Sequence, residues 1–312
     1  MKVAVEINNL SKYYGSFQAL KSLTLNIYEG EIFGLLGPNG AGKTTTLLIL
    51  ATVIKPSSGN VKVMGIDVTK EPLKVRKNIG FSFQEPKALR VDTVLDVLRW
   101  HGKICGLRGI ELEENIRRIM ANLGLAKYSG KMFMHLSGGL KKKVEVAKIL
   151  IQKPKIAIFD EPTAQVDVIG KHAIWNLIRE LRDEGSTIII ATNDMNEAEM
   201  LCDRIAIIHN GVIIVEGKPE ELKDKIPSGD ILEIELERNL TRKEIGLMVE
   251  KIGISNFKAT GRNIIFYINR GEEMLPIIME KMNSIGIKIK RTMIKEPTLD
   301  DVFFYFTGRT LR

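Results

Sequence analysis

A glycine-rich run near the amino-terminal end of the chain has the residue types that bind phosphate. It consists of Gly37, Pro38, Asn39, Gly40, Ala41, Gly42, Lys43, Thr44 and Thr45. The run follows the apolar segment 32–36 and precedes a helical pattern, which is the strand, loop and helix context of a P-loop. Its backbone N–H groups and the helix dipole would surround the phosphates. We expect Lys43 to contact the β- and γ-phosphates of ATP and the Thr44 hydroxyl to bind Mg²⁺.

Two adjacent carboxylates form a second candidate group. Asp160 and Glu161 follow four apolar residues, Ile156 to Phe159. A buried strand of a parallel sheet would present both acids at the sheet edge where ligands bind. We expect Asp160 to hold Mg²⁺, directly or through water, and Glu161 to polarise the attacking water as general base. The pattern is weak alone and gains force from the P-loop that precedes it.

A third motif identifies the family that the chain resembles. Leu136 is followed by Ser137, Gly138 and Gly139, between the P-loop and the two acids and before an apolar-periodic helix. The three motifs in this order resemble those of ABC ATPases, over roughly residues 3–222. The resemblance implies an α/β fold, the P-loop NTPase cassette, with a mixed sheet core, an N-terminal antiparallel β part and a helical insert.

The resemblance also implies roles for other residues. Tyr14 matches the aromatic residue that stacks on adenine, and Gln84 matches the glutamine that senses Mg²⁺, the γ-phosphate and the membrane partner. Asp167 matches the aspartate that crosses a dimer interface. Ser137 and the two glycines would form an anion cradle for the nucleotide of a second subunit, because the P-loop already holds the phosphates from the other side. A head-to-tail homodimer is the simplest arrangement, and a heterodimer is the alternative.

The chain departs from the family pattern at three places. Leu140 stands where the signature usually has glutamine, and residues 164–167 read Ala-Gln-Val-Asp in place of Ser-Gly-Leu-Asp. Asn193 stands where the family has its switch histidine. An asparagine amide donates a hydrogen bond to a γ-phosphate but cannot relay a proton. We expect Asn193 to lie in the catalytic site, with either slow hydrolysis or one inactive site in a heterodimer.

The end of the chain narrows the resemblance. Residues 297–303, Pro-Thr-Leu-Asp-Asp-Val-Phe, and the Thr-Gly-Arg at 307–309 look like the end of daunorubicin-resistance-type export ATPases. An ordinary capped terminal helix is the alternative interpretation. The resemblance implies ATP hydrolysis that powers a separate transmembrane permease, exporting drugs, lipids or other small molecules.

Two other functions stay open at this point. Asn193 is compatible with an ATP-gated clamp or regulatory subunit that closes on nucleotide and hardly hydrolyses it. A cassette used in DNA repair or on the ribosome is disfavoured, because such relatives carry long coiled coils or two cassettes in one chain. We therefore expect no nucleic-acid partner.

Composition predicts a cytoplasmic protein, and the resemblance implies that a permease holds it at the inner face of the membrane. The first residues lack the apolar stretch of a secretory signal, and no apolar window approaches the roughly 20 residues that span a bilayer. The basic residues behind the net charge of +8 are scattered, apart from the row Lys141, Lys142 and Lys143, and are expected on a solvated surface. Proximity to anionic lipid head groups is the alternative interpretation. Cys105 and Cys202 are expected to be ordinary buried residues. The four histidines form no ligand pair, so any metal should arrive with nucleotide.

Periodicity predicts two domains. Residues 3–36 alternate like antiparallel strands, residues 91–131 have helical spacing, and Asn210-Gly211 predicts a hairpin. An ATP-binding domain is therefore expected over 1–226, with a helical insert at about 88–150. A linker follows at 227–229, and a small α+β domain over 230–312 has the order β-α-β-β-α-β of a ferredoxin-like unit.

Overall fold

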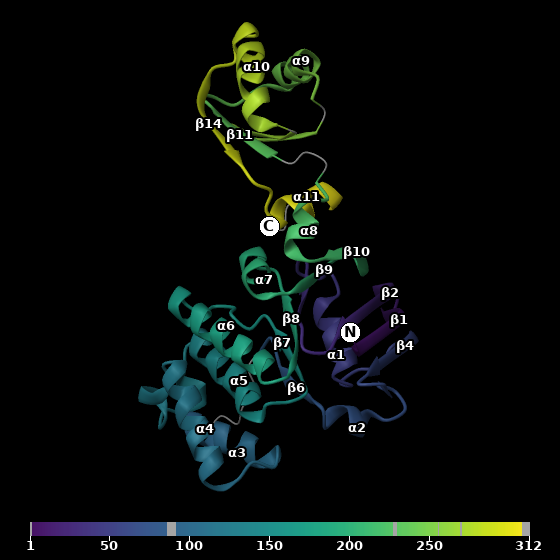
Figure 1. The fold of residues 1–312 in the computed structure, drawn as a ribbon, viewed down its shortest axis with the longest axis vertical. Helices are drawn as coiled ribbons and strands as arrows, with labels where there is room; N and C mark the ends of the chain where they lie inside the picture. The colour runs from purple at the N-terminus through teal and green to yellow at the C-terminus, as the bar shows by residue number, and fades with distance from the viewer. Residues whose placement is uncertain (1, 86–91, 227–229, 255, 269, 308–312) are drawn as a thin grey trace. The chain divides into compact units, whose positions relative to one another are not determined.

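The computed structural model describes residues 2–85, 92–226, 230–254, 256–268 and 270–307. They divide into two compact units, unit 1 up to Pro219 and unit 2 from Glu220 onward, each drawn in Figure 1. The linker predicted at 227–229 lies outside the described residues. The division between the units falls earlier in the chain, inside helix α8 (Pro219–Lys223).

The main sheet of unit 1 has six strands in the order β10-β9-β3-β8-β7-β6. The strands from β9 to β6 are parallel, and β10 joins antiparallel at one edge. Every residue of β3, β7 and β8 is buried, as expected for the apolar strands of a parallel sheet covered on both faces. The strands are β3 (Ile32–Leu36), β6 (Ile79–Ser82), β7 (Ile156–Asp160), β8 (Thr187–Thr192), β9 (Arg204–His209) and β10 (Val212–Gly217).

A second, antiparallel sheet combines two strands that precede the P-loop with two that follow it. Its order is β2-β1-β4-β5, formed by β1 (Val3–Tyr14), β2 (Phe17–Tyr28), β4 (Ser58–Val63) and β5 (Ile66–Asp67). The antiparallel prediction is confirmed for β1 and β2. It is wrong for β3, which pairs parallel with β8 and β9 in the main sheet. The reason is that β3 is apolar at every position and is buried on both faces, whereas β2 alternates.

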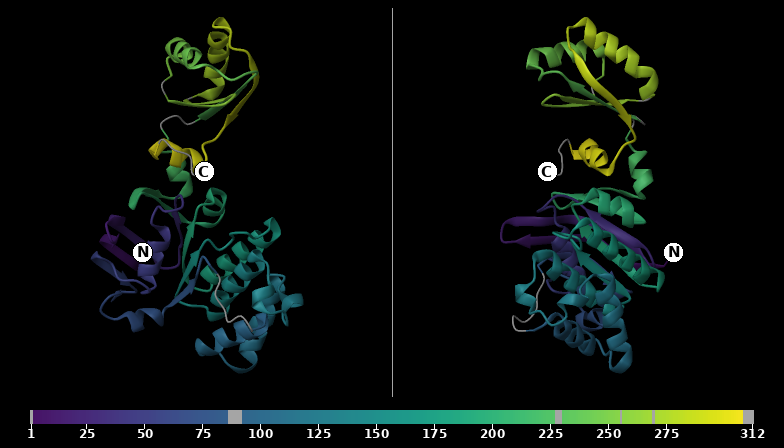
Figure 2. Two further views of the ribbon diagram at one scale, coloured as in Figure 1. Left: turned by 180° about the vertical axis from the view of Figure 1, so that it is seen from behind. Right: turned by 90° about the vertical axis from the view of Figure 1, so that its left-hand side faces the viewer.

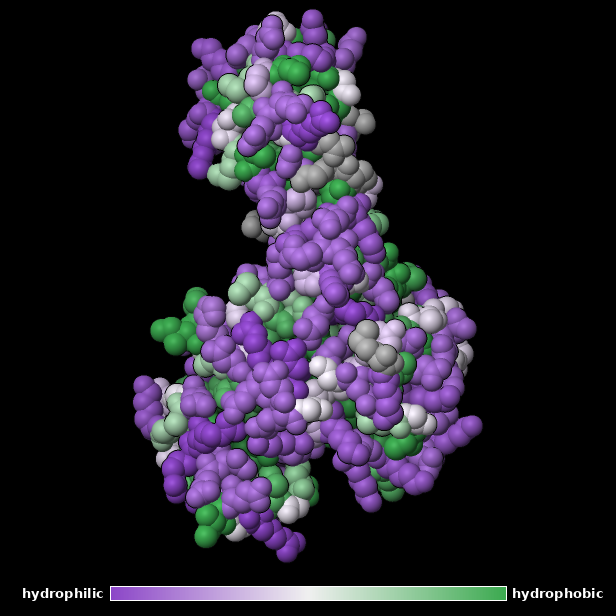
Figure 3. Space-filling view, in the orientation of Figure 1, coloured by the Kyte–Doolittle hydropathy of each residue, from purple (hydrophilic) through white to green (hydrophobic). Residues whose placement is uncertain are grey.

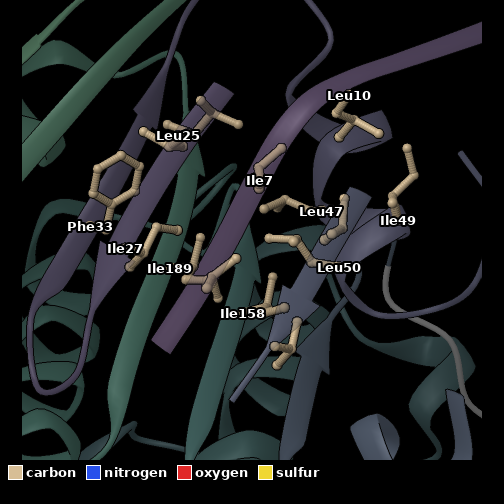
Figure 4. Packing of buried hydrophobic residues seen from close by; sticks show 14 of the residues in the cluster. Ile7, Leu10, Leu25, Ile27, Phe33, Leu47, Ile49, Leu50, Ile158 and Ile189 are labelled. Carbon is tan, nitrogen blue, oxygen red and sulfur yellow. The ribbon is translucent and has the colours of Figure 1, made fainter. Parts of the chain in front are cut away.

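The main core of unit 1 packs side chains of both sheets around helix α1 (Lys43–Leu50). Ile7 of β1, Leu47 of α1 and Ile158 of β7 are fully buried in one cluster, and Figure 4 shows them converging from these three elements. Alternation along β7 leaves Ala157 and Phe159 directed to the opposite face of the sheet. The P-loop helix and the strand that carries the acids are therefore fixed to each other through a shared core.

Of the remaining helices of unit 1, α3, α4 and α5 form the predicted helical insert. α3 begins at a capping box formed by Thr93 and Asp96, and α5 packs against α3, α4, α6 and β6. Figure 2 shows helices α3 to α6 grouped on one side of the main sheet, whereas Val75 of α2 belongs to the core that contains α1. The helices after α1 are α2 (Pro72–Arg76), α3 (Val94–Ile104), α4 (Gly109–Asn122), α5 (Gly138–Gln152), α6 (Val168–Asp183) and α7 (Met195–Leu201), with short 3₁₀ turns at Ala126–Tyr128 and Phe133–His135.

The predicted hairpin is present between β9 and β10. Its two turn residues, Asn210 and Gly211, have φ values of 49° and 81°. Positive φ at both central positions is the requirement of a type I′ turn, which explains the Asn-Gly pair. Cys202, just before β9, is buried as predicted, but Cys105 is exposed, so the prediction of a buried residue is wrong there.

Unit 2 forms a four-stranded antiparallel sheet in the order β12-β13-β11-β14. Helices α9 and α10 lie on one face of this sheet (Figures 1 and 2). The buried residues of the unit form a separate core that includes Leu232, Phe266 and Met282. We propose to classify the unit as ferredoxin-like, since its element order is β-α-β-β-α-β. Its elements are β11 (Asp230–Leu236), α9 (Arg242–Ile252), β12 (Phe257–Thr260), β13 (Asn263–Ile268), α10 (Gly271–Ser284), β14 (Ile289–Lys295) and α11 (Leu299–Thr307).

The surface is mixed in polarity. Hydrophilic residues dominate the visible face of each unit in Figure 3, and hydrophobic residues occur in scattered patches. Within the described parts of the chain, no helix combines the length and the apolar character needed to cross a bilayer.

Removing residues 220–312 should leave unit 1 folded. The described residues of the unit 1 core include none from unit 2, and those of the unit 2 core include none from unit 1. We expect one cooperative thermal transition for residues 1–219, measured by calorimetry. As a control, a chain cut after Leu201, which also loses β9 and β10, should show none. Aggregation of the 1–219 chain without a cooperative transition would contradict the division into units.

Candidate nucleotide-binding site

The P-loop lies between β3 and α1, and two of its glycines are required by close backbone contacts. The Gly37 N–H donates to the carbonyl of Thr192 at the end of β8, over 3.3 Å. A Cβ at Gly37 would lie 2.3 Å from the carbonyl oxygen of Ile208. Gly42 caps α1 with φ of 112°, a conformation that glycine adopts without steric cost. The loop is therefore held against two strands of the main sheet.

Lys43 is buried at the base of this loop, with only 5% of its surface exposed. Its Nζ donates to the carbonyl oxygens of Gly37 at 2.6 Å and Pro38 at 3.1 Å. Burial lowers the pKa of Lys43, and the charges of Glu161 and Asp160 oppose that shift. The ammonium is thus fixed within the loop and close to both predicted catalytic acids.

Thr44 and Asp160 are in direct contact. The Thr44 hydroxyl donates to Oδ2 of Asp160 over 2.8 Å. The carboxylate is 1% exposed, and its Oδ1 is buried without a hydrogen-bond partner among the described residues. Burial raises the pKa of Asp160, while the hydrogen bond from Thr44 lowers it. A buried carboxylate oxygen that lacks a partner, beside a hydroxyl, is a donor set that suits a hard cation such as Mg²⁺.

Glu161 and Gln84 lie beside this pair. Gln84 Nε2 donates to Glu161 Oε2 over 3.2 Å. Glu161 has φ of 51°, and its N–H donates to the carbonyl of Ala191 in β8 over 2.8 Å. A left-handed conformation at a glutamate is unfavourable and is retained where surrounding bonds impose it, often at functional sites. The backbone thus directs this carboxylate toward the loop that carries Gln84.

A cavity of about 260 Å³ joins most of the predicted residues. Tyr14 and Phe17 border it from the turn between β1 and β2, where they are cross-strand partners and are 47% and 62% exposed. Phe17 was not among the predicted residues, although an aromatic residue across a tight turn from Tyr14 was a usable signal. The lining consists of Tyr14, Phe17, Ala19, Pro38, Asn39, Gly40, Gly42, Lys43, Thr44, Thr45, Gln84 and Glu161.

The signature residues lie outside this cavity. Ser137 is the N-cap of α5 and accepts a hydrogen bond from the Leu140 N–H over 3.4 Å. Gly138 lines a second cavity, of about 350 Å³, which shares Gln84 and Glu161 with the first. Within one chain, the predicted residues therefore form two groups that meet at Gln84 and Glu161.

The loop after Glu161 covers the start of the signature helix. Gln165 has φ of 62°, and its side-chain oxygen would lie 2.0 Å from a Cβ at Gly138. Its carbonyl oxygen would lie 2.5 Å from a Cβ at Gly139. Gly139 is therefore needed for this packing, because a Cβ there would meet a backbone oxygen, whereas at Gly138 it would meet the end of a movable side chain. Asp167, two residues on, is the N-cap of α6 and accepts from the Gly170 N–H over 2.5 Å.

Asn193 follows the last residue of β8 and is exposed, and it is not among the residues that line the first cavity. Its neighbour Asp194 caps α7 and forms an ion pair with Lys171 of α6 at 2.6 Å. Hydrogen bonds from Lys171 and the α7 backbone hold the pKa of Asp194 low, although burial acts in the opposite direction. The loop that carries Asn193 is thus anchored to α6.

Glu197 is a buried carboxylate that the sequence did not single out. It is 1% exposed and accepts from the Thr163 hydroxyl at 2.8 Å and from Trp175 Nε1 at 3.0 Å. Burial raises its pKa. Glu197 joins the loop after Glu161 to α6 and α7. A glutamate on an amphipathic helix has no sequence signal that would separate it from a surface residue.

Comparison with known proteins agrees with this geometry. Residues 20–164 match the ABC transporter family model. Nod factor export ATP-binding protein I of Cupriavidus metallidurans is 32% identical over 315 residues, which cover 100% of both chains. Daunorubicin/doxorubicin resistance ATP-binding protein DrrA of Streptomyces peucetius is 29% identical and covers 98% of this chain and 92% of its own.

The solved structures include similar cassettes. A dimeric structure of the ATP-binding cassette MJ0796, in a post-hydrolysis state bound to ADP and Pi, has a TM-score of 0.63 and 29% identity. The aligned region covers 69% of this chain and 98% of the MJ0796 chain. The chain therefore belongs to the ABC transporter family as an ATP-binding and ATP-hydrolysing subunit, and within that family it resembles the daunorubicin-resistance type.

Proposed function

We propose that this subunit hydrolyses MgATP to power a separate transmembrane permease, and that the complex exports a small molecule. The observation that carries the site assignment is that Lys43, Thr44 and Glu161 line one cavity beside the P-loop. The buried carboxylate of Asp160 accepts a hydrogen bond from the Thr44 hydroxyl of that lining. Export is supported by the full-length similarity to Nod factor and daunorubicin export or resistance subunits. The permease would hold the subunit at the inner face of the cell membrane. We expect no nucleic-acid partner.

Each residue of the site would have a distinct role in ATP hydrolysis. Tyr14 offers an exposed ring to the adenine, and the P-loop N–H groups with Lys43 hold the phosphates. Thr44, Asp160 and Gln84 offer oxygen ligands to Mg²⁺, which would neutralise charge on the phosphates. Glu161 accepts a proton from the attacking water, and Gln84 holds its carboxylate in place.

The separation of the signature from the P-loop cavity supports a dimer. Ser137 caps the 15-residue helix that Gly138 and Gly139 begin, but none of the three lines the P-loop cavity of its own chain. A second subunit in head-to-tail orientation would bring its signature to this chain's nucleotide, and the exchange would be reciprocal. The similar cassette MJ0796 has been solved as a dimer. A homodimer is the simplest form of this proposal.

A second candidate function is an ATP-gated clamp with little hydrolysis. It is favoured by Asn193, which cannot relay a proton, and by its exposed position outside the cavity lining. Turnover of the purified protein distinguishes the two functions, because both predict ATP binding and only the motor predicts rapid hydrolysis.

Lys43→Ala should weaken ATP binding by about ten- to hundredfold, because a hydrogen bond to a charged group contributes about 1.5–3 kcal/mol. Calorimetric titration with MgATP measures the dissociation constant. Lys55→Ala, at an exposed lysine of the same unit, is the control and should bind like the wild type. Unchanged ATP affinity and turnover in Lys43→Ala would exclude the P-loop as the binding site.

Glu161→Gln should keep nucleotide binding and reduce kcat by roughly 10²–10⁴-fold, the range for loss of a general base. An ATP-bound dimer should then accumulate and be visible by size-exclusion chromatography with MgATP. Glu114→Gln, at an exposed position on α4, is the matched control. A variant that stays monomeric with MgATP, alongside an active wild type, would argue against the head-to-tail dimer.

Asn193→His should raise steady-state hydrolysis by about tenfold or more if Asn193 slows this site, because an imidazole would hold the γ-phosphate and orient the water. Release of phosphate from saturating MgATP measures the change. An unchanged rate in the variant, with a wild type that already turns over rapidly, would eliminate the clamp and show that Asn193 suffices.

A further inference from the structure

Lys142 is a buried lysine three residues after the signature glycine Gly139. Only 3% of its surface is exposed, so the prediction of a solvated lysine row is wrong at this position. The helical period explains the difference, because Lys142 lies on the face of α5 that also buries Glu145 and Val146. Its neighbours Lys141 and Lys143 are only partly buried.

The ammonium of Lys142 contacts three backbone carbonyl oxygens. Nζ donates to Gln84 at 2.7 Å, to Phe83 at 3.1 Å and to Asp160 at 3.3 Å. An ammonium has three donors, so these three acceptors match its capacity. Burial lowers the pKa of Lys142, and the nearby carboxylates of Asp160 and Glu145 oppose that change. Lys142 therefore connects α5, by buried hydrogen bonds, to the loop at Phe83 and Gln84 and to the end of β7.

Each of the three carbonyls belongs to a segment that carries a proposed functional residue. The Phe83 and Gln84 carbonyls belong to the loop that directs the Gln84 side chain onto Glu161. The Asp160 carbonyl belongs to the peptide bond that leads into Glu161, whose φ is 51°. Lys142 therefore holds the backbone on both sides of the Gln84–Glu161 hydrogen bond.

We propose that Lys142 is a positioning residue for ATP hydrolysis, which fixes Gln84 and Glu161 relative to each other through their backbones. The proposal rests on the proposed function. Because α5 begins at Gly138, the same contact links the signature helix to the residues that act on the attacking water. Lys142 is not among the residues that line the cavity beside the P-loop, and its hydrogen bond to Asp160 goes to the backbone carbonyl. It lines the second cavity, together with Gln84 and Glu161.

The test is Lys142→Met, which keeps an unbranched side chain and removes the three donors. We expect kcat to fall about ten- to hundredfold, the effect of a small misplacement of catalytic groups, while KM for ATP stays within about threefold. Lys142→Arg retains the charge and the donors and should recover part of kcat. The control is Lys155→Met, at an exposed lysine that immediately precedes β7, at the end of that strand away from Asp160. Its kcat should match that of the wild type. If Lys142→Met does not fold, Lys142→Gln takes its place.

Hydrogen exchange, measured without nucleotide, tests the Lys142 proposal independently of the proposed function. Hydrogen exchange of peptides that cover residues 79–85 should accelerate in Lys142→Met and stay unchanged in Lys155→Met. A folded Lys142→Met protein with wild-type kcat or wild-type exchange would overturn the positioning role. A parallel loss of kcat, ATP affinity and melting temperature would also overturn it, because that is the result of general destabilisation. Absence of turnover in the wild type would instead reject the proposed function, and the exchange result would still test the Lys142 contact.

Discussion

The hydrogen bond from the Thr44 hydroxyl to the Asp160 carboxylate is the contact around which unit 1 is organised. It joins the first turn of α1 to the end of β7, across 116 residues of sequence and over 2.8 Å. It requires β3, β8 and β7 to be neighbours in this order, so that their carboxyl ends meet at one edge. The shared core of Leu47 and Ile158 keeps the helix and the strand in that register.

The site is surrounded by ionisable groups that are buried and individually partnered. Lys43 and Lys142 donate to backbone carbonyls, and Glu197 accepts from a hydroxyl and an indole. Glu145 pairs with Lys148 at 2.6 Å. Removing one member of such a contact leaves a buried polar group without its partner, which costs about 1–3 kcal/mol or more for a charged group. These contacts therefore confine the loops around the cavity to one arrangement.

The departures from the family pattern are accommodated locally. Gln165 adopts a left-handed backbone conformation and packs its side chain over Gly138, so the altered loop stays in contact with the signature helix. Asn193 follows a strand whose last residue, Thr192, accepts from the P-loop at Gly37. The backbone before Asn193 therefore lies next to the phosphate loop, while Asn193 itself is exposed.

The sequence by itself determined the elements and the order of the motifs. Glycine and lysine spacing, apolar runs that end in acids, and the Asn-Gly turn depend on neighbours along the chain, and the P-loop, β7 and the hairpin agree with them. The strand order, the parallel pairing of β3, the exposed Cys105 and the burial of Lys142 and Glu197 were decided only by the tertiary structure. The physical reason is that these contacts join residues far apart in the sequence. Lys142 donates to a carbonyl 58 residues away, and Thr163 donates to Glu197, 34 residues away. Such pairs exist only once packing has selected which face of each helix is turned inward.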